Sequence, residues 1–486
     1  MCNRLIVITC ILFFTIFLRI ENLTWGLPYL LDGDEWRVIN SGLSIHYIAN
    51  PDQYPAYFLQ GYPPFRLWEV ALTRAVFMPE YPVTGAKAVS TQIILGRYFT
   101  IGYFLITLAA IYRIMRMLKI RWQVAASGIL AITLLEPLNR ISRLTLADSP
   151  ALMFAMLSLW MSLKSWQTPK PIYLLSAYCL AVFAFITKYN YVFFAIPVSI
   201  VTLILYTKGR LTRQYIWIIP SLFIMMAILL GVFIHTMGAD ELLCPILRDQ
   251  TEHCWSNPDD IQTEVPIYDF PDTPLERLNT NLGYLNTQFS IILVFLAVFY
   301  GVMSSQTPLR IIALTGLIGF ISISWLQATT SRQIIWIMVL IIVILSHLLN
   351  KRWKLLPLVL ISIIFFRGLP YFETIRLLDQ PDSRAAVANW LAQNGTDGMR
   401  IASEVPLYEV NQLSGFPGEQ TFDVIIDPTL AGKSKEELLA QGYNVLIISE
   451  DSFLNFDRIR QDFSVIAQFR QPAYEGPTRI IVVVDN

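Results

Sequence analysis

Charge is scarce in this sequence. Only 15% of its 486 residues are Asp, Glu, Lys or Arg, whereas an ordinary soluble domain carries about 25%. This shortage excludes a chain that is soluble throughout its length. The sequence is instead rich in apolar residues, which make up 55% of it, and its mean hydropathy is +0.51. The composition therefore predicts a membrane protein, and a formal net charge of zero says nothing about nucleic acid.

Histidine and cysteine are also few, and the sequence has no internal repeat. Four histidines are scattered along the chain: His46, His235, His253 and His347. They have no fixed ligand spacing, so they indicate a metal only weakly. Two of the five cysteines, Cys244 and Cys254, share one polar loop. That spacing allows a disulfide in an oxidising compartment or two free thiols, and both interpretations stay open.

Long apolar runs fill most of the first 370 residues. Eleven of them, some of them short, could cross a bilayer: 5–20, 92–112, 122–138, 149–163, 171–187, 190–206, 215–237, 286–303, 309–326, 332–350 and 354–369. The first run is short enough to be a secretory signal, but residues 21–25 make a poor cleavage site. We expect an uncleaved anchor.

Basic residues follow a strict alternation between these runs. Every second connection, counted from the N-terminus, together holds fourteen Lys and Arg and no Asp or Glu: Arg4, Arg113, Arg116, Lys119, Arg121, Lys164, Lys170, Lys208, Arg210, Arg213, Arg310, Lys351, Arg352 and Lys354. The acidic residues fall in the other connections. Cytoplasmic loops are enriched in Lys and Arg, so the pattern predicts a cytoplasmic N-terminus, an extracytoplasmic Asp34 and an extracytoplasmic C-terminus.

The chain divides into two parts. Residues 1–370 form the membrane body, interrupted by long outer loops at 21–91 and 238–285, the first of which suggests helices lying along the membrane surface. Residues 371–486 have the composition of a small α/β domain. Helices are expected at 382–394 and 434–441, and strands at 399–405, 422–426, 444–449, 464–469 and 479–484. No Gly-rich phosphate loop follows a strand, so we do not interpret this domain as a nucleotide site.

The acidic pair Asp34-Glu35 is the first candidate site. It follows the first apolar run, and neither carboxylate is needed to hold that helix in lipid. A carboxylate there could accept a proton from a hydroxyl or ligate a divalent cation. The alternative is a solvated loop.

Basic residues on the predicted outer side form the second group of candidates. Arg140, Arg143 and Asp148 lie in one connection, where an arginine could bind phosphate or pair with the aspartate to fix a turn. Lys188 and Arg332 interrupt apolar sequence near the same side. Such cations mark functional sites or extend toward the membrane surface. Together these residues suggest an anionic, lipid-linked substrate.

A set of short motifs occurs in a recognisable order. A short first helix is followed by Asp34-Glu35, then by Tyr-Pro-Pro at 62–64, Leu-Gly-Arg-Tyr at 95–98, Arg-Leu-Thr-Leu-Ala-Asp at 143–148 and Thr-Lys-Tyr-Asn at 187–190. In this order the chain resembles the GT-C membrane glycosyltransferases, in particular protein O-mannosyltransferases and lipid A aminoarabinose transferases. The tail, with Asp-Ser-Arg at 382–384 and Trp390, resembles that of bacterial members.

The resemblance implies a polytopic α-helical GT-C fold of about eleven transmembrane helices, in a bacterial-type inner membrane, with an extracytoplasmic α/β domain. It implies sugar transfer from a polyprenyl-phosphate donor to a lipid, glycan or protein acceptor, with no nucleic-acid partner. Asp34 would be the base, Glu35 would support it, and basic residues would hold the phosphate: Arg143, Lys188 and Arg332, with Asp148 among them. Aminoarabinose transferases carry Lys where this chain has Tyr62, so that subfamily's substrates are not implied; Tyr62 remains a substrate-binding candidate. The alternative is a transporter or flippase of lipid-linked saccharides.

Overall fold

The structure is a computed structural model. It describes most of the helical body and the regular elements of the C-terminal part. The described residues are 2–21, 23–24, 35, 64–77, 86–211, 273–326, 331–363, 366, 368–369, 383–395, 399–403, 423–426, 435–443, 445–449, 464–470 and 479–484. Asp34, Tyr62, Cys244 and Cys254 and the expected span at 215–237 lie outside these residues.

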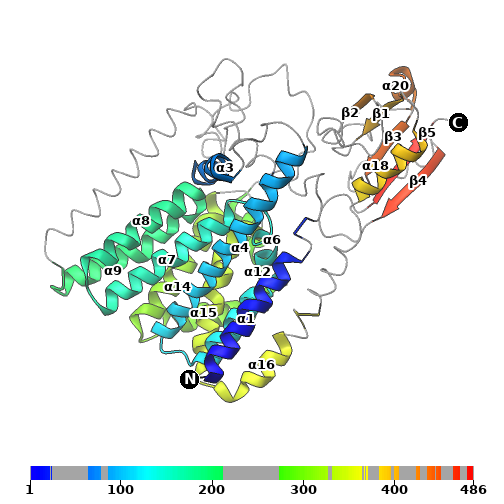
Figure 1. The fold of residues 1–486 in the computed structure, drawn as a ribbon. Helices are drawn as coiled ribbons and strands as arrows, with labels where there is room; N and C mark the ends of the chain where they lie inside the picture. Colours follow the sequence, from blue (N-terminus) through cyan, green and yellow to red (C-terminus); the bar gives the residue numbers. More distant parts are fainter. Residues whose placement is uncertain are drawn as a thin grey trace.

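Helices make up the body of the molecule (Figure 1). In chain order they are α1 (Cys2–Ile20), α3 (Pro64–Phe77), α4 (Ala86–Met117), α5 (Trp122–Thr133), α6 (Glu136–Ile141), α7 (Asp148–Gln167), α8 (Pro171–Thr187), η4 (Tyr189–Phe194), α9 (Ala195–Thr207), α12 (Pro274–Gln288), α13 (Ile291–Val302), α14 (Thr307–Leu326), η6 (Ser331–Ile334), α15 (Ile335–Asn350), η7 (Trp353–Leu355) and α16 (Leu356–Ile363).

Several of these helices can cross a membrane. Within the described residues, four spans are long and apolar enough, at 91–117, 190–207, 307–325 and 332–350; the pair α12 and α13, which bends by 99°, makes a fifth if it is one span. Four shorter apolar helices accompany them. Phe295 and Phe299 of α13 are 61% and 67% exposed in the isolated chain, as expected for side chains that face lipid. A helical membrane body is therefore confirmed, and the number of eleven spans stays a prediction.

Proline explains one departure from the expected spans. The run at 122–138 is divided, since α5 ends at Thr133 and α6 begins at Glu136 with Pro137 in its first turn. Proline fits the first turn of a helix but not its interior, where it lacks the N–H of the i to i−4 hydrogen bond. The chain therefore breaks and restarts at this point. A second departure, unrelated to proline, is α4, which begins at Ala86, six residues before the predicted start at 92.

A large apolar core in the described part of the bundle includes residues of α4, α5, α7 and α15, and a second cluster joins α8, α9 and α14. Trp336 of α15 is fully buried between the rings of Phe193 and Phe194. It fits because Gly319 of α14 has no side chain: a Cβ there would lie 2.1 Å from the indole. Arg19 ties α1 into the bundle, since it donates to the carbonyl of Thr133 at 2.8 Å.

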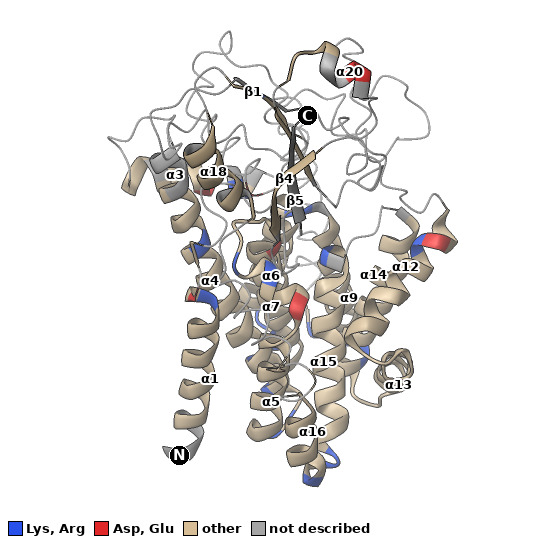
Figure 2. Cartoon of the chain, turned by 90° about the vertical axis from the view of Figure 1, so that its right-hand side faces the viewer, with Lys and Arg blue, Asp and Glu red and all other residues tan. Residues whose placement is uncertain are grey.

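The basic connections meet at one end of the bundle. The amide nitrogen of Arg121 donates to the Asn350 side chain at 2.8 Å, and the Arg121 guanidinium lies 4.8 Å from the ring of Trp353. Lys208 lies 4.7 Å from the ring of Trp166. Figure 2 shows Lys and Arg at the turn before α16, at the end of the bundle where the N-terminus lies. The alternation of charge along the sequence thus corresponds to a separation in space.

The C-terminal part contains a five-stranded sheet, drawn in orange and red in Figure 1. Its elements are α18 (Ser383–Asn394), β1 (Arg400–Ser403), β2 (Asp423–Ile426), α20 (Lys435–Ala440), β3 (Val445–Ser449), β4 (Ser464–Arg470) and β5 (Arg479–Val484). The strand order is β2-β1-β3-β5-β4; β1 is parallel to β2 and β3, and β5 is antiparallel to β3 and β4. Val387 and Leu391 of α18 pack on Ile401, Val445 and Ile447 of the sheet.

Candidate functional site

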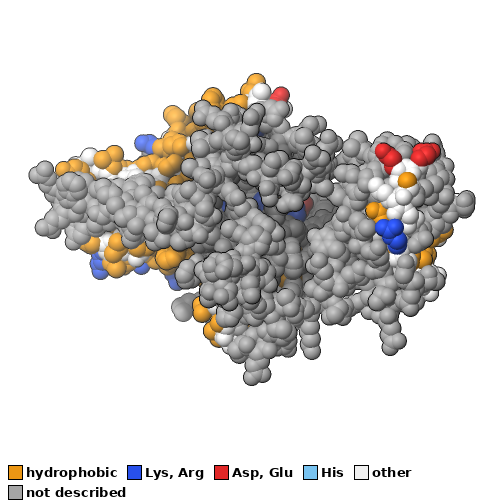
Figure 3. All heavy atoms as spheres, turned by 90° about the horizontal axis from the view of Figure 1, so that it is seen from above, with side chains coloured by type: hydrophobic (Ala, Val, Ile, Leu, Met, Phe, Trp, Pro, Cys, Tyr) orange, Lys and Arg blue, Asp and Glu red, His pale blue; other side chains and the backbone are white. Residues whose placement is uncertain are grey.

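The described candidate residues gather at the end of the bundle opposite the basic connections. Glu35, Arg143, Asp148, Lys188 and Arg332 all belong to this end, which carries the loop before α7, the junction of α8 with η4, and the start of η6. Figure 3 looks onto this end and shows a few charged atoms of both signs near the centre of the view.

Glu35 is fully buried and fully engaged. Its two carboxylate oxygens accept hydrogen bonds from Arg97 of α4, from Nε at 2.9 Å and from Nη2 at 2.7 Å. The backbone N–H of Thr145 donates to the same carboxylate at 2.8 Å, and Arg97 also donates to the carbonyl of Leu23 at 2.6 Å. This bidentate geometry is the strong form of a carboxylate–guanidinium pair. Glu35 is therefore fixed both to α4 and to the loop before α7.

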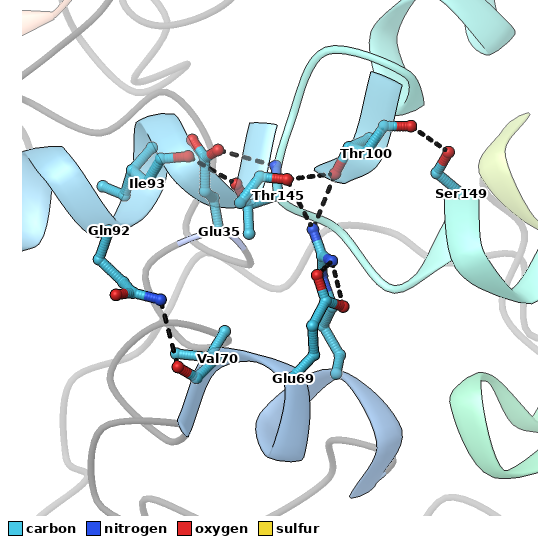
Figure 4. Close-up of polar contacts among 10 residues, drawn as sticks. Glu35, Glu69, Val70, Gln92, Ile93, Thr100, Thr145 and Ser149 are labelled. Atoms are coloured by element: carbon cyan, nitrogen blue, oxygen red, sulfur yellow. Dashed lines mark hydrogen bonds and ion pairs between the residues drawn. The ribbon is translucent and has the colours of Figure 1, made fainter. Parts of the chain in front are cut away.

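A close backbone approach makes that contact possible. A Cβ on Gly96 would lie 2.5 Å from Cγ2 of Thr145, so only glycine lets the loop before α7 lie this close to α4. The Thr145 hydroxyl in turn donates to the carbonyl of Ile93 at 3.2 Å. Figure 4 shows how Glu35, Thr145 and Ile93 converge.

The helix α3 supports the same region of α4. Arg66 is fully buried, forms an ion pair with Glu69 one turn later and donates to the Thr100 hydroxyl at 2.7 Å. Gln92 donates to the carbonyl of Val70 at 3.2 Å (Figure 4). These contacts fix α3 against the bundle, and whether this helix lies along the membrane surface stays a prediction.

Asp148 and Lys188 form an ion pair. Asp148 is the first residue of α7, and Lys188 follows the last residue of α8. The aspartate side chain is 3% exposed and the lysine side chain 25%, so the pair has one buried member and one that reaches the surface. A carboxylate in the first turn of a helix is further stabilised by the positive end of the helix dipole.

Arg143 lies just before this pair in the chain. It is 6% exposed, and its Nη2 donates to the carbonyl of Glu21 at 2.6 Å. Its Nη1 is buried with no hydrogen-bond partner among the described residues. An arginine whose Nη1 has no partner among the described residues retains the capacity to bind an anion.

The start of η6 lies beside η4. The amide of Asn190 donates to the carbonyl of Gln333 at 3.4 Å, which brings the turn that carries Lys188 close to the turn that carries Arg332. Arg332 is partly buried. The structure thus brings Lys188, Asp148 and the segment of Arg332 together, while Glu35 joins them through Thr145.

Sequence reasoning did not single out Arg97 or Thr145 as site residues. Arg97 belongs to the Leu-Gly-Arg-Tyr motif at 95–98, where the Gly-Arg pair was the available signal. Thr145 acts through its backbone N–H, which leaves no trace in residue type. Among the described residues no three His, Cys, Asp or Glu side chains group into a metal site.

Residues 85–235 match the family described as dolichyl-phosphate-mannose-protein mannosyltransferase. No curated protein matches the chain.

Solved structures match over almost the whole chain. The apo structure of ArnT from Cupriavidus metallidurans has a TM-score of 0.52 at 12% identity and covers 98% of this chain and 97% of its own. The structure of the same enzyme bound to undecaprenyl phosphate has the same TM-score and identity and covers 99% and 97%. An oligosaccharyltransferase from Archaeoglobus fulgidus aligns at a TM-score of 0.49 and 10% identity, over 98% of this chain and 76% of its own.

The matches point to one class of protein. The chain shares the fold of ArnT and is similar to the O-mannosyltransferases over residues 85–235, as expected of a GT-C membrane glycosyltransferase. The resemblance drawn from the order of the sequence motifs is confirmed.

Proposed function

We propose that this protein transfers a sugar from a polyprenyl-phosphate donor to an acceptor hydroxyl on the outer face of the membrane. The observation that carries the proposal is the Glu35 clamp. A buried, bidentate contact fixes the residue next to Asp34 at the end of the bundle where Arg143 and the Asp148–Lys188 pair also lie. The family match and the shared fold with ArnT support the same activity.

The proposed roles follow from the chemistry of the reaction. A phosphate-linked sugar already has a good leaving group, so the enzyme needs cations that stabilise the departing phosphate and a base for the acceptor hydroxyl. Lys188, Arg143 and Arg332 are the cations, and Asp34 is the base. Glu35 is a positioning residue, because both of its oxygens are occupied by Arg97. A divalent cation would be an alternative partner for Asp34.

The orientation follows from the separation of charge. The end of the bundle that holds Arg121, Lys208 and the turn before α16 would face the cytoplasm, because cytoplasmic loops are enriched in Lys and Arg. The Glu35 clamp then faces outward, and the α/β domain of residues 371–486 lies on the outer side of an inner membrane.

The first prediction concerns Asp34. We expect Asp34→Asn to lower transfer by about 10²- to 10⁴-fold, the usual contribution of a general base, while expression and thermal unfolding stay as in the wild type. The assay supplies purified protein with a polyprenyl-phosphate sugar and a panel of acceptors, and follows release of polyprenyl phosphate. Glu436→Gln is the matched control, since Glu436 is an exposed carboxylate of α20, and its activity should be unchanged.

The same assay separates the transporter alternative. A transporter moves the donor lipid across a liposome membrane without consuming it. The wild type and Asp34→Asn would then both leave the lipid chemically intact. Full transfer activity in the Asp34→Asn variant would refute the assigned base. If a chelator abolishes transfer and a divalent cation restores it, Asp34 is a metal ligand and not the base.

A further inference from the structure

The Asp148–Lys188 pair has a third neighbour with an unusual property. Tyr191 is fully buried, and its hydroxyl has no hydrogen-bond partner among the described residues. Tyr191 lies three residues after Lys188, the lysine of the pair, in the helix η4 that packs against α7, the helix that begins with Asp148. A buried hydroxyl without a partner costs free energy, so its presence in the element next to this ion pair calls for an explanation.

The backbone holds the three groups together. The N–H of Tyr191 donates to the carbonyl of Lys188 at 3.0 Å, so Tyr191 lies one 3₁₀ turn after the lysine. The helix η4, to which Tyr191 belongs, packs against α7, which begins at Asp148. The Tyr191 ring stacks on Phe194 with their centroids 6.1 Å apart.

Lys188 can leave Asp148 more easily than Asp148 can move. The lysine side chain is 25% exposed and the aspartate 3%. A phosphate that arrives at this surface attracts the lysine, and the aspartate would then remain buried without its cation. A buried carboxylate that loses its partner is strongly unfavourable, so turning Lys188 toward a ligand requires a second group that satisfies Asp148.

We propose that Tyr191 is that second group. When Lys188 turns to the phosphate of a polyprenyl-phosphate ligand, the Tyr191 hydroxyl donates a hydrogen bond to Asp148 and replaces the lysine there. The dipole of α7 helps to keep the aspartate charged in the meantime. Tyr191 is thus a positioning residue for the ligand phosphate that acts through Asp148 and does not contact the phosphate itself. This inference rests on the proposed function, since it takes Lys188 as a phosphate ligand.

The test removes only the hydroxyl. Tyr191→Phe in the full-length protein is expected to weaken binding of polyprenyl phosphate about tenfold, which is the size of a hydrogen bond to a charged group. Binding of polyprenol, which has the same chain but no phosphate, should not change. The midpoint of thermal unfolding should not fall, because the hydroxyl has no hydrogen bond to lose among the described residues.

Tyr178→Phe is the matched control. Tyr178 is a buried tyrosine of α8 whose hydroxyl shares a hydrogen bond with that of Thr202 at 3.2 Å. It lies ten residues before Lys188, which corresponds to about 15 Å along a helix. Removing its hydroxyl should lower thermal stability slightly and leave binding of both lipids unchanged.

A double-variant cycle tests the route through Asp148. In an Asp148→Asn background no buried charge needs a new partner, so adding Tyr191→Phe should change polyprenyl phosphate binding by no more than about twofold. The inference is overturned if Tyr191→Phe weakens the binding of polyprenyl phosphate and of polyprenol equally, or if it changes neither. It is also overturned if the tenfold effect on polyprenyl phosphate binding persists in the Asp148→Asn background.

Binding and transfer are measured separately, so failure of the role of Tyr191 can be told from failure of the proposed sugar transfer. If the wild-type protein binds polyprenyl phosphate more tightly than polyprenol but transfers no sugar, the transferase proposal fails and the role of Tyr191 is still decided by binding. If the wild type shows no preference for the phosphate, the inference fails with it.

Discussion

The buried pair of Glu35 and Arg97 allows a quantitative prediction. Arg97→Met removes the guanidinium and leaves the fully buried Glu35 carboxylate with the backbone N–H of Thr145 as its remaining partner in the contacts described above. Breaking a buried ion pair by removing one member costs about 3–5 kcal/mol, because the other charge stays buried without compensation. We therefore expect Arg97→Met to be one of the most destabilising single substitutions at this end of the bundle.

The size of the effect has an internal check. In the double variant Glu35→Gln/Arg97→Met neither charge remains, and the glutamine carbonyl can still accept from Thr145. The double variant should therefore unfold with a higher midpoint than Arg97→Met alone, since the uncompensated charge is gone. The contact of Arg97 with the carbonyl of Leu23 is lost in both variants and cancels from the comparison.

The assay is thermal unfolding of the purified proteins in detergent, followed by intrinsic fluorescence, for which the chain has 12 tryptophans. Transfer activity is measured at a temperature where all variants are folded. If the double variant is less stable than Arg97→Met, the two losses simply add. That result would refute the reasoning that the stranded Glu35 charge is the main cost.

Two glycines give further predictions. Gly96→Ala should reduce transfer and stability, since the new Cβ must displace Thr145 at a cost of about 1–3 kcal/mol, and Thr145→Ala should restore part of the loss in a thermal shift assay. Gly319→Ala should be at least as destabilising, because its Cβ would lie 2.1 Å from the Trp336 ring. Gly102→Ala is the control for both: nothing lies within 4 Å of its Cβ, so better helix propensity should raise stability by up to about 1 kcal/mol. Equal losses for all three substitutions would contradict the packing argument.

Part of the site could be predicted residue by residue, but not its pairings. The sequence marked Asp148 and Lys188 as separate candidates and left a turn-fixing contact between Arg143 and Asp148 as an alternative. In the structure Asp148 pairs with Lys188 and Arg143 binds the carbonyl of Glu21. Both partners are distant in sequence, and no pattern of residue types states which of several nearby cations a carboxylate will select.

Helix ends show the same limit. The apolar runs at 171–187 and 149–163 agree with α8 and α7 to within a few residues, because hydropathy over some twenty residues is a local property of the chain. The run at 122–138 was interrupted at Pro137, and α4 extends beyond its apolar run at both ends. Helical hydrogen bonding continues past the apolar stretch until packing or a proline ends it.

Hydropathy and charge alternation by themselves determined that this chain has a helical membrane body and that its basic connections share one side, since both follow from how individual residues partition between lipid and water. Only the tertiary structure decided that Glu35 is an anchor held by Arg97, 62 residues away. That contact exists because α4 and the loop before α7 approach each other across Gly96. Such an approach depends on the packing of whole helices, which no local stretch of sequence encodes.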